Sequence, residues 1–238
     1  MAMRGFPVTR WTLILSAGKE KSAAADEAVA ELCRAYWFPV YAFVRRFGTA
    51  PDEAEDLTQD FFARFIEMRN LLSADPAKGR FRSFLLTSVK HFLSDQAERR
   101  HAEKRGGKNR VLALNLADAE KRYAREFAAK DTPESLFERE WAVTLMARVN
   151  DNVRTALGRE GHAGQFDRLK PFLPGGDEEP SYSEVAARLG TSEGALKVAV
   201  HRFRRRYREV FRAEIAHLVS DPDLVEDEVR HLLQVLRS

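Results

Sequence analysis

The stretch SYSEVAARLGTSEGALKVAVHRFRRRYREVF, residues 181–211, decides the fold that we expect. Three apolar residues near its start fall on one helical stripe: Val185, Ala186 and Leu189. Gly190 follows at a place where a helix end needs a residue that tolerates positive φ. Thr191 and Ser192 then supply an N-cap for a second helix. The stretch therefore predicts two helices joined by a tight glycine turn.

The second of these helices has two distinct faces. Its apolar residues form an inward stripe: Leu196, Val200, Phe203 and Tyr207. On the outer side, behind the cap Ser192, lie Gly194, Lys197, Val198, His201, Arg202 and Arg205. Most of these outer side chains can donate to phosphates or to base edges. A short helix, a glycine turn and a cap before such a face favour a helix-turn-helix that binds DNA. The alternative is a solvated cationic helix end.

The rest of the chain shows helical periodicity and no convincing alternation, so we expect an all-α protein. Further helices are predicted at 9–17, 24–47, 51–72, 80–105, 133–157, 165–172 and 222–236. Weak periodicity and the run GGKNR mark 106–132 as a linker between two small helical domains, and this linker can contain some helix. The predicted organisation is an N-terminal extension 1–23, a first domain 24–105, the linker, a helix-turn-helix domain 133–215 and a C-terminal amphipathic helix 216–238.

Composition restricts the classes of protein. The 238 residues are 44% hydrophobic, which is enough for real cores, and the net charge is only +3. Basic residues gather at 99–110 and 202–212, and acidic residues at 52–60 and 221–228. A single cysteine, Cys33, excludes an internal disulfide and a cysteine-rich zinc site. The first residues lack a signal-peptide core and no stretch approaches membrane-spanning length, so we expect a cytoplasmic protein.

No pattern in the chain indicates an enzyme. The six histidines are scattered, and neither HExxH nor the glycines of a Walker motif are present. The acids of 52–60 have no histidine or lysine at an obvious catalytic spacing. We therefore expect no catalytic residue, no metal and no cofactor.

Two segments of the first domain carry binding hypotheses. DEAEDLTQDFFARFIE, residues 52–67, crowds five acids into the first turns of an aromatic helix, which suggests docking to a basic partner surface. A solvated face stabilised by the helix dipole is the alternative. GRFRSFLLTSVKHFLSDQAERRHAEKR, residues 79–105, interleaves aromatic with basic residues, as suits unstacked single-stranded bases. Here the alternative places the aromatics in the core.

The order of these three motifs resembles the bacterial RNA polymerase sigma factors of the extracytoplasmic-function group. DEAEDLTQDFF is similar to the family's DAEDLVQEVF helix, which docks on the clamp helices of the largest polymerase subunit. The resemblance implies polymerase contacts by Asp52, Glu55, Asp56, Leu57, Gln59, Asp60 and Phe62. It implies two partners, core RNA polymerase and promoter DNA.

The resemblance also implies two DNA contacts. FRSFLLTSVKHFLSDQAERR is similar to the family's minus-ten helix, which holds a flipped base. The resemblance implies DNA contacts by Arg82, Lys90, His91, Asp95, Arg99 and Arg100. TSEGALKVAVHRFRRR is similar to the helix that binds the minus-thirty-five element, with contacts on the outer face listed above. Val198 and Ala199 replace the family's common Ser-Arg pair, so we expect phosphate contacts and a steep salt dependence to dominate.

The sequence is compatible with several modes of regulation. Both ends of the chain look like extensions of some planctomycete-type members of the group. The C-terminal helix could pack on its own domain, bind a regulator or cover the basic DNA face. An anti-sigma protein and a Ser/Thr kinase are candidate partners, and Thr58 is a hypothetical phosphorylation site. The rival function is a one-component regulator that binds duplex DNA without polymerase.

Overall fold

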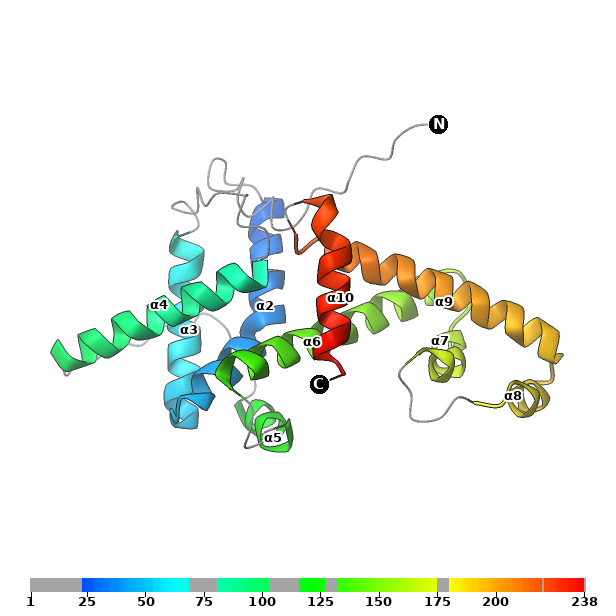
Figure 1. The fold of residues 1–238 in the computed structure, drawn as a ribbon, viewed down its shortest axis with the longest axis horizontal. Coiled ribbons are helices and arrows are strands. Elements are labelled where there is room, and N and C mark those ends of the chain that lie inside the picture. The colour runs from blue at the N-terminus through cyan, green and yellow to red at the C-terminus, as the bar shows by residue number, and fades with distance from the viewer. Residues whose placement is uncertain are drawn as a thin grey trace. The chain divides into compact units, whose positions relative to one another are not determined.

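The computed structural model describes residues 23–68, 81–102, 116–126, 132–174, 180–219 and 221–237. Within these ranges the regular elements are helices and no strand is present, which confirms the all-α prediction. They are α2 (Ala23–Arg46), α3 (Pro51–Met68), α4 (Phe81–Ala102), α5 (Leu116–Glu126), α6 (Pro133–Arg159), α7 (Gln165–Leu169), η2 (Lys170–Phe172), α8 (Tyr182–Leu189), α9 (Glu193–Ala216), η3 (Pro222–Leu224) and α10 (Val225–Val235) (Figure 1). The helix predicted at 9–17 lies outside the described residues.

The chain forms two compact units. Unit 1 combines Met1–Thr144 with Ile215–Ser238, and unit 2 is Leu145–Glu214. The boundaries between the units fall inside α6 and α9. The C-terminal segment therefore belongs to the same unit as the first helices, whereas the sequence places it after the second domain. The domain bounds 24–105 and 133–215 stay a prediction.

Aromatic rings from four helices form the core of unit 1. Phe81 of α4 packs against Tyr36 of α2 at 4.9 Å between ring centroids and against Phe65 of α3 at 6.3 Å. Phe137 of α6 packs edge-on to Phe43 of α2 at 6.3 Å. Each of these rings is buried. Aromatic pairs in these geometries stabilise a core beyond the area that they bury.

Three elements of unit 1, α3, α6 and η3, begin at a proline. α3 begins at Pro51, where the missing N–H of proline costs no helical hydrogen bond, and acids fill its first turn. α6 begins at Pro133, and the backbone N–H of Ser135 donates to Thr132 Oγ1 at 3.1 Å. Asp221 accepts from the backbone N–H of Asp223 at the start of η3, at 2.9 Å. A proline at each start, and a capping side chain at α6 and η3, thus set where these elements begin.

One helix lies where the sequence predicts a linker. α5 occupies Leu116–Glu126 within unit 1, and its residue Ala119 is buried. Glu120 accepts from Tyr41 Oη and from Arg45 Nε of α2, the latter at 2.8 Å. Arg122 lies over the ring of Phe38, 3.9 Å from its centroid. The predicted linker thus contains a helix, and these contacts anchor that helix to α2.

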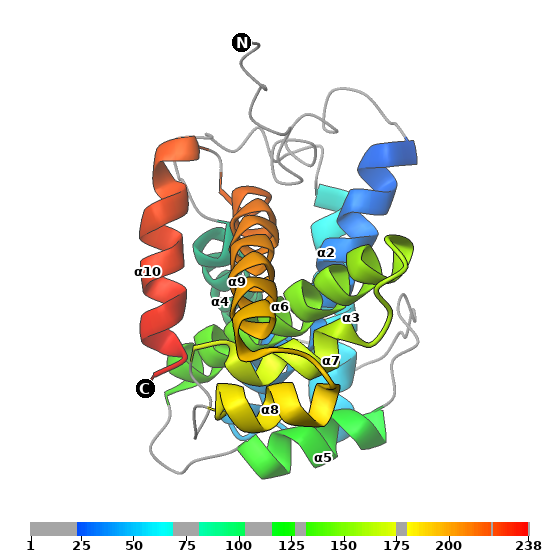
Figure 2. The same cartoon turned by 90° about the vertical axis from the view of Figure 1, so that its right-hand side faces the viewer.

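Unit 2 is built around α9. Buried residues from α6, α7, η2 and α8 face it, among them Val153, Phe166, Phe172 and Val185. Phe166 meets Phe203 of α9 at 5.9 Å, edge to face. α8 crosses beneath the first turns of α9 and is seen lengthwise in Figure 2. This packing fixes one side of α9 and leaves the other side to solvent.

Candidate nucleic-acid interface

The turn between α8 and α9 is set by three local hydrogen-bonding groups. Ser181 Oγ accepts from the backbone N–H of Glu184 and caps the start of α8. Gly190 has φ 65° and ψ 34°, and the backbone N–H of Thr191 donates to the carbonyl of Ala186 at 3.0 Å. Ser192 Oγ then accepts from the backbone N–H of Ala195 at 3.2 Å. The predicted C-cap glycine and N-cap serine are both confirmed.

The inward stripe of α9 is the one that the sequence predicts. Its members are all buried: Leu196, Val200, Phe203 and Tyr207. Tyr207 Oη donates to Asn150 Oδ1 of α6 at 2.7 Å, and burial raises the pKa of Tyr207 to about 12. On α8, Val185 and Ala186 are buried, but Leu189 is exposed. The prediction that Leu189 belongs to the buried stripe is therefore wrong, since this last residue of α8 lies at the helix end.

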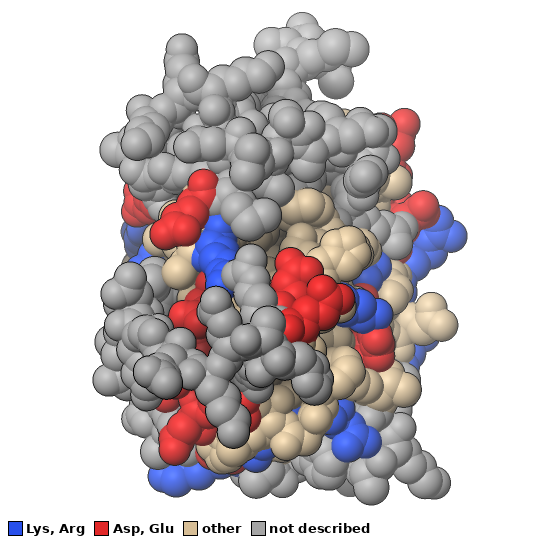
Figure 3. All heavy atoms as spheres, turned by 90° about the vertical axis from the view of Figure 1, so that its left-hand side faces the viewer, with Lys and Arg blue, Asp and Glu red and all other residues tan. Residues whose placement is uncertain are grey.

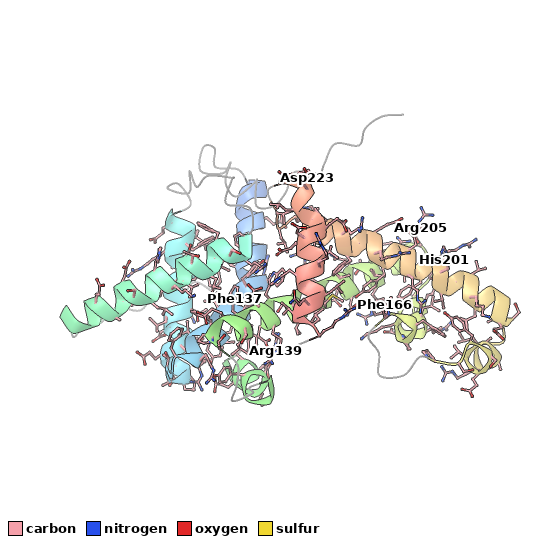
Figure 4. The ribbon with its side chains drawn as sticks, viewed as in Figure 1. Phe137, Arg139, Phe166, His201, Arg205 and Asp223 are labelled. Carbon is pink, nitrogen blue, oxygen red and sulfur yellow. The ribbon has the colours of Figure 1, made fainter. Side chains whose placement is uncertain are left out.

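The opposite side of α9 is exposed along its predicted length. We call it the α9 face, and its exposed residues are Gly194, Lys197, Val198, His201, Arg202 and Arg205, with Ser192 before the helix. Val198 is the apolar member, with 51% of its surface exposed. Figure 4 shows His201 and Arg205 along α9, and Phe166 on α7. The structure thus brings together every residue predicted for the minus-thirty-five contact.

Some basic side chains of α9 form ion pairs with acidic residues. Lys197 Nζ lies 2.7 Å from Glu193 Oε1, and Arg205 Nε lies 3.0 Å from Glu209 Oε1. Both pairs are exposed and connect neighbouring turns, so each contributes little to stability. Arg206 differs, because its two terminal nitrogens donate to both carboxylate oxygens of Glu160 at 2.6 Å. Arg206 is therefore committed to packing within unit 2, while the α9 face keeps its side chains in solvent.

The predicted polymerase-binding residues of α3 divide into two groups. Asp52 and Asp56 are exposed and Asp60 is half-buried, so these three can meet a partner. Four others are buried: Glu55, Leu57, Gln59 and Phe62. Gln59 Nε2 donates to Glu55 Oε1 at 2.9 Å within the helix. The expectation that Glu55 lies on an accessible acidic face is wrong, because its carboxylate is used inside unit 1. Figure 3 shows acidic side chains at several places on the face that α3 and α4 present, with basic side chains among them.

Burial also affects two further groups of α3. Burial raises the pKa of Asp60, and the neighbouring Asp56 adds to the rise while Arg64 opposes it. Thr58 is fully buried, and its hydroxyl donates to the carbonyl of Ala54 at 2.7 Å. A kinase could not reach this hydroxyl while α3 is folded in place. Phosphorylation of Thr58 is therefore disfavoured in this conformation.

The residues of α4 that are predicted to contact the minus-ten element also differ in their exposure. Lys90, His91 and Asp95 are exposed, and Lys90 Nζ lies 2.7 Å from Glu134 Oε1 at the start of α6. The hydrogen bond from Lys90 lowers the pKa of Glu134. Arg99 and Arg100 belong to α4, but their side chains lie outside the described part.

Arg82 is buried, which contradicts the expectation that it lies on the outer side of α4. Its Nε donates to Glu228 Oε1 of α10 at 2.6 Å, and Nη1 donates to Glu138 Oε1 of α6. Its guanidinium also lies over the ring of Trp141, 5.3 Å from the centroid. Sequence reasoning missed Glu138 and Glu228, because no local pattern links residues this far apart in the chain.

Two features are absent from the residues that the structure describes. None of the helices in these ranges is long and apolar enough to span a bilayer. The same residues contain no group of three or more histidine, cysteine or acidic side chains placed to hold a metal ion.

A comparison with protein families identifies the first three described helices. Residues 23–103 match the family model of Sigma-70 region 2. The match covers α2, α3 and α4, and it supports a sigma factor, a non-enzymatic factor of transcription initiation. Sigma-70 region 2 binds core RNA polymerase and promoter DNA. Searches of the curated proteins and of the solved structures found no match.

Proposed function

We propose that this chain is a two-domain sigma factor of the extracytoplasmic-function group, which directs bacterial RNA polymerase to specific promoters. The observation that carries the proposal is the Sigma-70 region 2 match over residues 23–103, followed in the same chain by the exposed basic face of α9. A sigma factor needs both a polymerase-docking and melting domain and a second contact to duplex DNA. The planctomycete-type assignment is part of this proposal.

In the proposed mechanism, α3 docks the chain on polymerase. Asp52 and Asp56 point into solvent at the start of the helix, and the half-buried Asp60 extends the acidic surface by one turn. Complementary charge increases the association rate and fixes the orientation of two proteins. The buried residues Leu57 and Phe62 support this surface from beneath. They act through the core and not by direct contact.

The proposed melting step uses α4. Flipping a base out of the duplex costs a few kcal/mol of pairing and stacking, which protein contacts to the separated strand must offset. Lys90 and His91 are exposed on α4 and can contact phosphate and base atoms, and Asp95 can accept from a base amino group. No bond is made or broken in this step, so it requires no catalytic residue.

The proposed duplex contact uses the α9 face as a recognition helix in the major groove. Lys197, Arg202 and Arg205 supply donors for phosphates, and His201 lies among them. A shallow hollow on the same helix is lined by Arg202, Arg205, Arg206, Glu209 and Val210. With few base-edge donors available, affinity should depend strongly on salt concentration.

The test is run-off transcription from a promoter library by purified bacterial core polymerase, with and without this chain. The proposal predicts transcripts from defined sites only when the chain is present. A variant with Asp52→Asn and Asp56→Asn should initiate less at limiting chain concentration while it keeps its helicity. If the chain neither joins core polymerase nor directs initiation, yet binds duplex DNA alone, the one-component regulator replaces the sigma factor.

A further inference from the structure

The C-terminal segment holds the first turn of α4 at two separate points. The backbone N–H of Phe81 donates to the carbonyl of Leu218 at 3.2 Å, and the Arg82 side chain is bound by Glu228. The first N–H groups of a helix have no partner within that helix, so Leu218 supplies one from outside. Figure 1 shows α10 near α6 and the start of α4. Both contacts lie inside unit 1.

The two carboxylates that bind Arg82 take different edges of its guanidinium. Glu228 accepts from Nε at 2.6 Å and from Nη2 at 3.4 Å, whereas Glu138 accepts from Nη1 alone. Glu138 is held in turn by His231 Nε2 at 2.8 Å. The edge formed by Nε and Nη2 is one that binds a phosphate in the same two-pronged manner. Glu228 therefore occupies the position that a phosphate oxygen pair would take on Arg82.

The pair is also unusual in its burial. The Glu228 side chain is 1% exposed and that of Arg82 is 6% exposed, so both charges have left water. Burial alone would lower the pKa of Arg82. The hydrogen bond and charge of Glu228, together with the charge of Glu138, outweigh burial, so the pKa of Arg82 is raised. A buried pair of this kind is weak evidence for stability, and its best-attested roles are to fix a register or to act as a switch.

We propose that α10 is an intramolecular latch, in which Glu228 occupies the phosphate-binding edge of Arg82 until single-stranded nucleic acid displaces it. The inference rests on the proposed function, because it takes melted DNA as the ligand of unit 1. When α10 leaves, Glu138 keeps Nη1 and orients the guanidinium, while Nε and Nη2 become available to a strand phosphate. The latch thus couples promoter melting to release of the C-terminal helix.

The first test is a double-mutant cycle on the full chain, with a fluorescein-labelled 20-nucleotide single-stranded DNA of random sequence as the probe. Glu228→Gln should bind the probe about five- to tenfold more tightly than the unchanged chain, as expected for one added charge-assisted contact. Adding Arg82→Gln should return the affinity to about that of the unchanged chain. The latch is overturned if the gain persists without Arg82.

A matched control exists on the same helix. Asp227 and Arg230 form an ion pair on α10 with side chains 45% and 77% exposed, so Asp227→Asn changes the net charge as Glu228→Gln does without opening a buried contact. We expect less than about a twofold gain from Asp227→Asn, since an exposed pair contributes little. An equal gain in Glu228→Gln and Asp227→Asn would overturn the latch.

Hydrogen exchange on the unchanged chain covers the case in which Glu228→Gln fails to fold. With saturating probe, the amides of α10 and of Phe81 should exchange faster than in the free chain. Unchanged or slower exchange overturns the latch. The run-off assay separates the two proposals. If the chain directs initiation but Glu228→Gln binds the probe no more tightly than Asp227→Asn, the latch alone is wrong. If Glu228→Gln gains probe affinity through Arg82 but the chain directs no initiation, the sigma function alone is wrong.

Discussion

Glu120 of α5 accepts hydrogen bonds from Arg45 of α2, at 2.8 Å from Nε and 3.2 Å from Nη2. Tyr41 Oη donates to the same carboxylate. Three donor groups of α2 thus bind one carboxylate, and this carboxylate belongs to a segment that the sequence assigns to a linker. The hydrogen bond from Arg45 lowers the pKa of Glu120. These hydrogen bonds anchor α5 to α2, one of the helices in the Sigma-70 region 2 match.

Replacing Glu120 should therefore destabilise unit 1. We expect Glu120→Gln to lower the free energy of unfolding by about 1–2 kcal/mol, because it weakens charge-assisted hydrogen bonds in a partly exposed site. Chemical denaturation followed by circular dichroism measures the change. Glu98→Gln, on the exposed side of α4, removes the same charge and should leave stability within about 0.5 kcal/mol. Equal effects of the two variants would mean that α5 is not anchored by this contact.

The same contact predicts a pH dependence. The pKa of Glu120 is lower in the folded chain than in the unfolded chain. Its contribution to the free energy of unfolding is therefore fully present above the ordinary glutamate pKa, and it is lost as the pH falls through the pKa of the folded chain. The stability difference between the unchanged chain and Glu120→Gln should accordingly shrink in acid. Denaturation curves at neutral pH and at successively lower pH values measure it. A difference that stays constant down to the acid end contradicts the prediction.

The exposed acids of α3 should determine affinity for core polymerase. The double change Asp52→Asn and Asp56→Asn is expected to weaken binding by about tenfold and to reduce its salt dependence, because long-range attraction is lost. Fluorescence anisotropy of the labelled chain with core polymerase measures this. A control with Asp223→Asn and Asp227→Asn makes the same change of net charge in the C-terminal segment. Equal weakening in both double variants would assign the effect to net charge and not to α3.

Two arginines of α9 should affect DNA binding differently. Arg202→Gln is expected to reduce the slope of log affinity against log salt by about 1, as for one lost phosphate contact. Arg206→Gln should leave that slope unchanged and instead lower stability, because Arg206 is bound by Glu160. Promoter binding by the polymerase complex at several salt concentrations tests both. A reduced slope for Arg206→Gln alone would show that a different face of α9 meets DNA.

Cys33 should be unreactive in the folded chain. Its side chain is buried, and burial raises the pKa of its thiol from 9.0 to about 12. We expect a thiol reagent at pH 8 to label the chain only as fast as unit 1 opens, and denaturant to accelerate labelling. Because this pKa is raised by folding, the buried thiol contributes fully to the free energy of unfolding below pH 9.0. This contribution is lost as the pH rises toward about 12. Rapid labelling under native conditions would contradict the burial of Cys33.

Local patterns determined the helices and the faces of α9. Gly190 and Ser192 carry their own conformational preferences, and the stripe from Leu196 to Tyr207 follows the helical period, so neighbouring residues are sufficient to predict them. The exposed α9 face follows from the same period. The acidic start of α3 is equally local, although the period did not reveal that Glu55 and Gln59 turn inward.

Tertiary structure decided which of these surfaces are used internally. Arg82, Glu138 and Glu228 come from three helices far apart in the chain, and no local preference can indicate that they share one buried site. The same holds for α5, because its anchor joins Glu120 to Arg45, 75 residues earlier in the chain. Sequence periodicity determined that this protein is helical and where the basic face of α9 lies. Only packing between distant segments decided that the C-terminal helix lies against the region 2 helices, because that contact depends on burial and charge pairing, which a linear pattern does not contain.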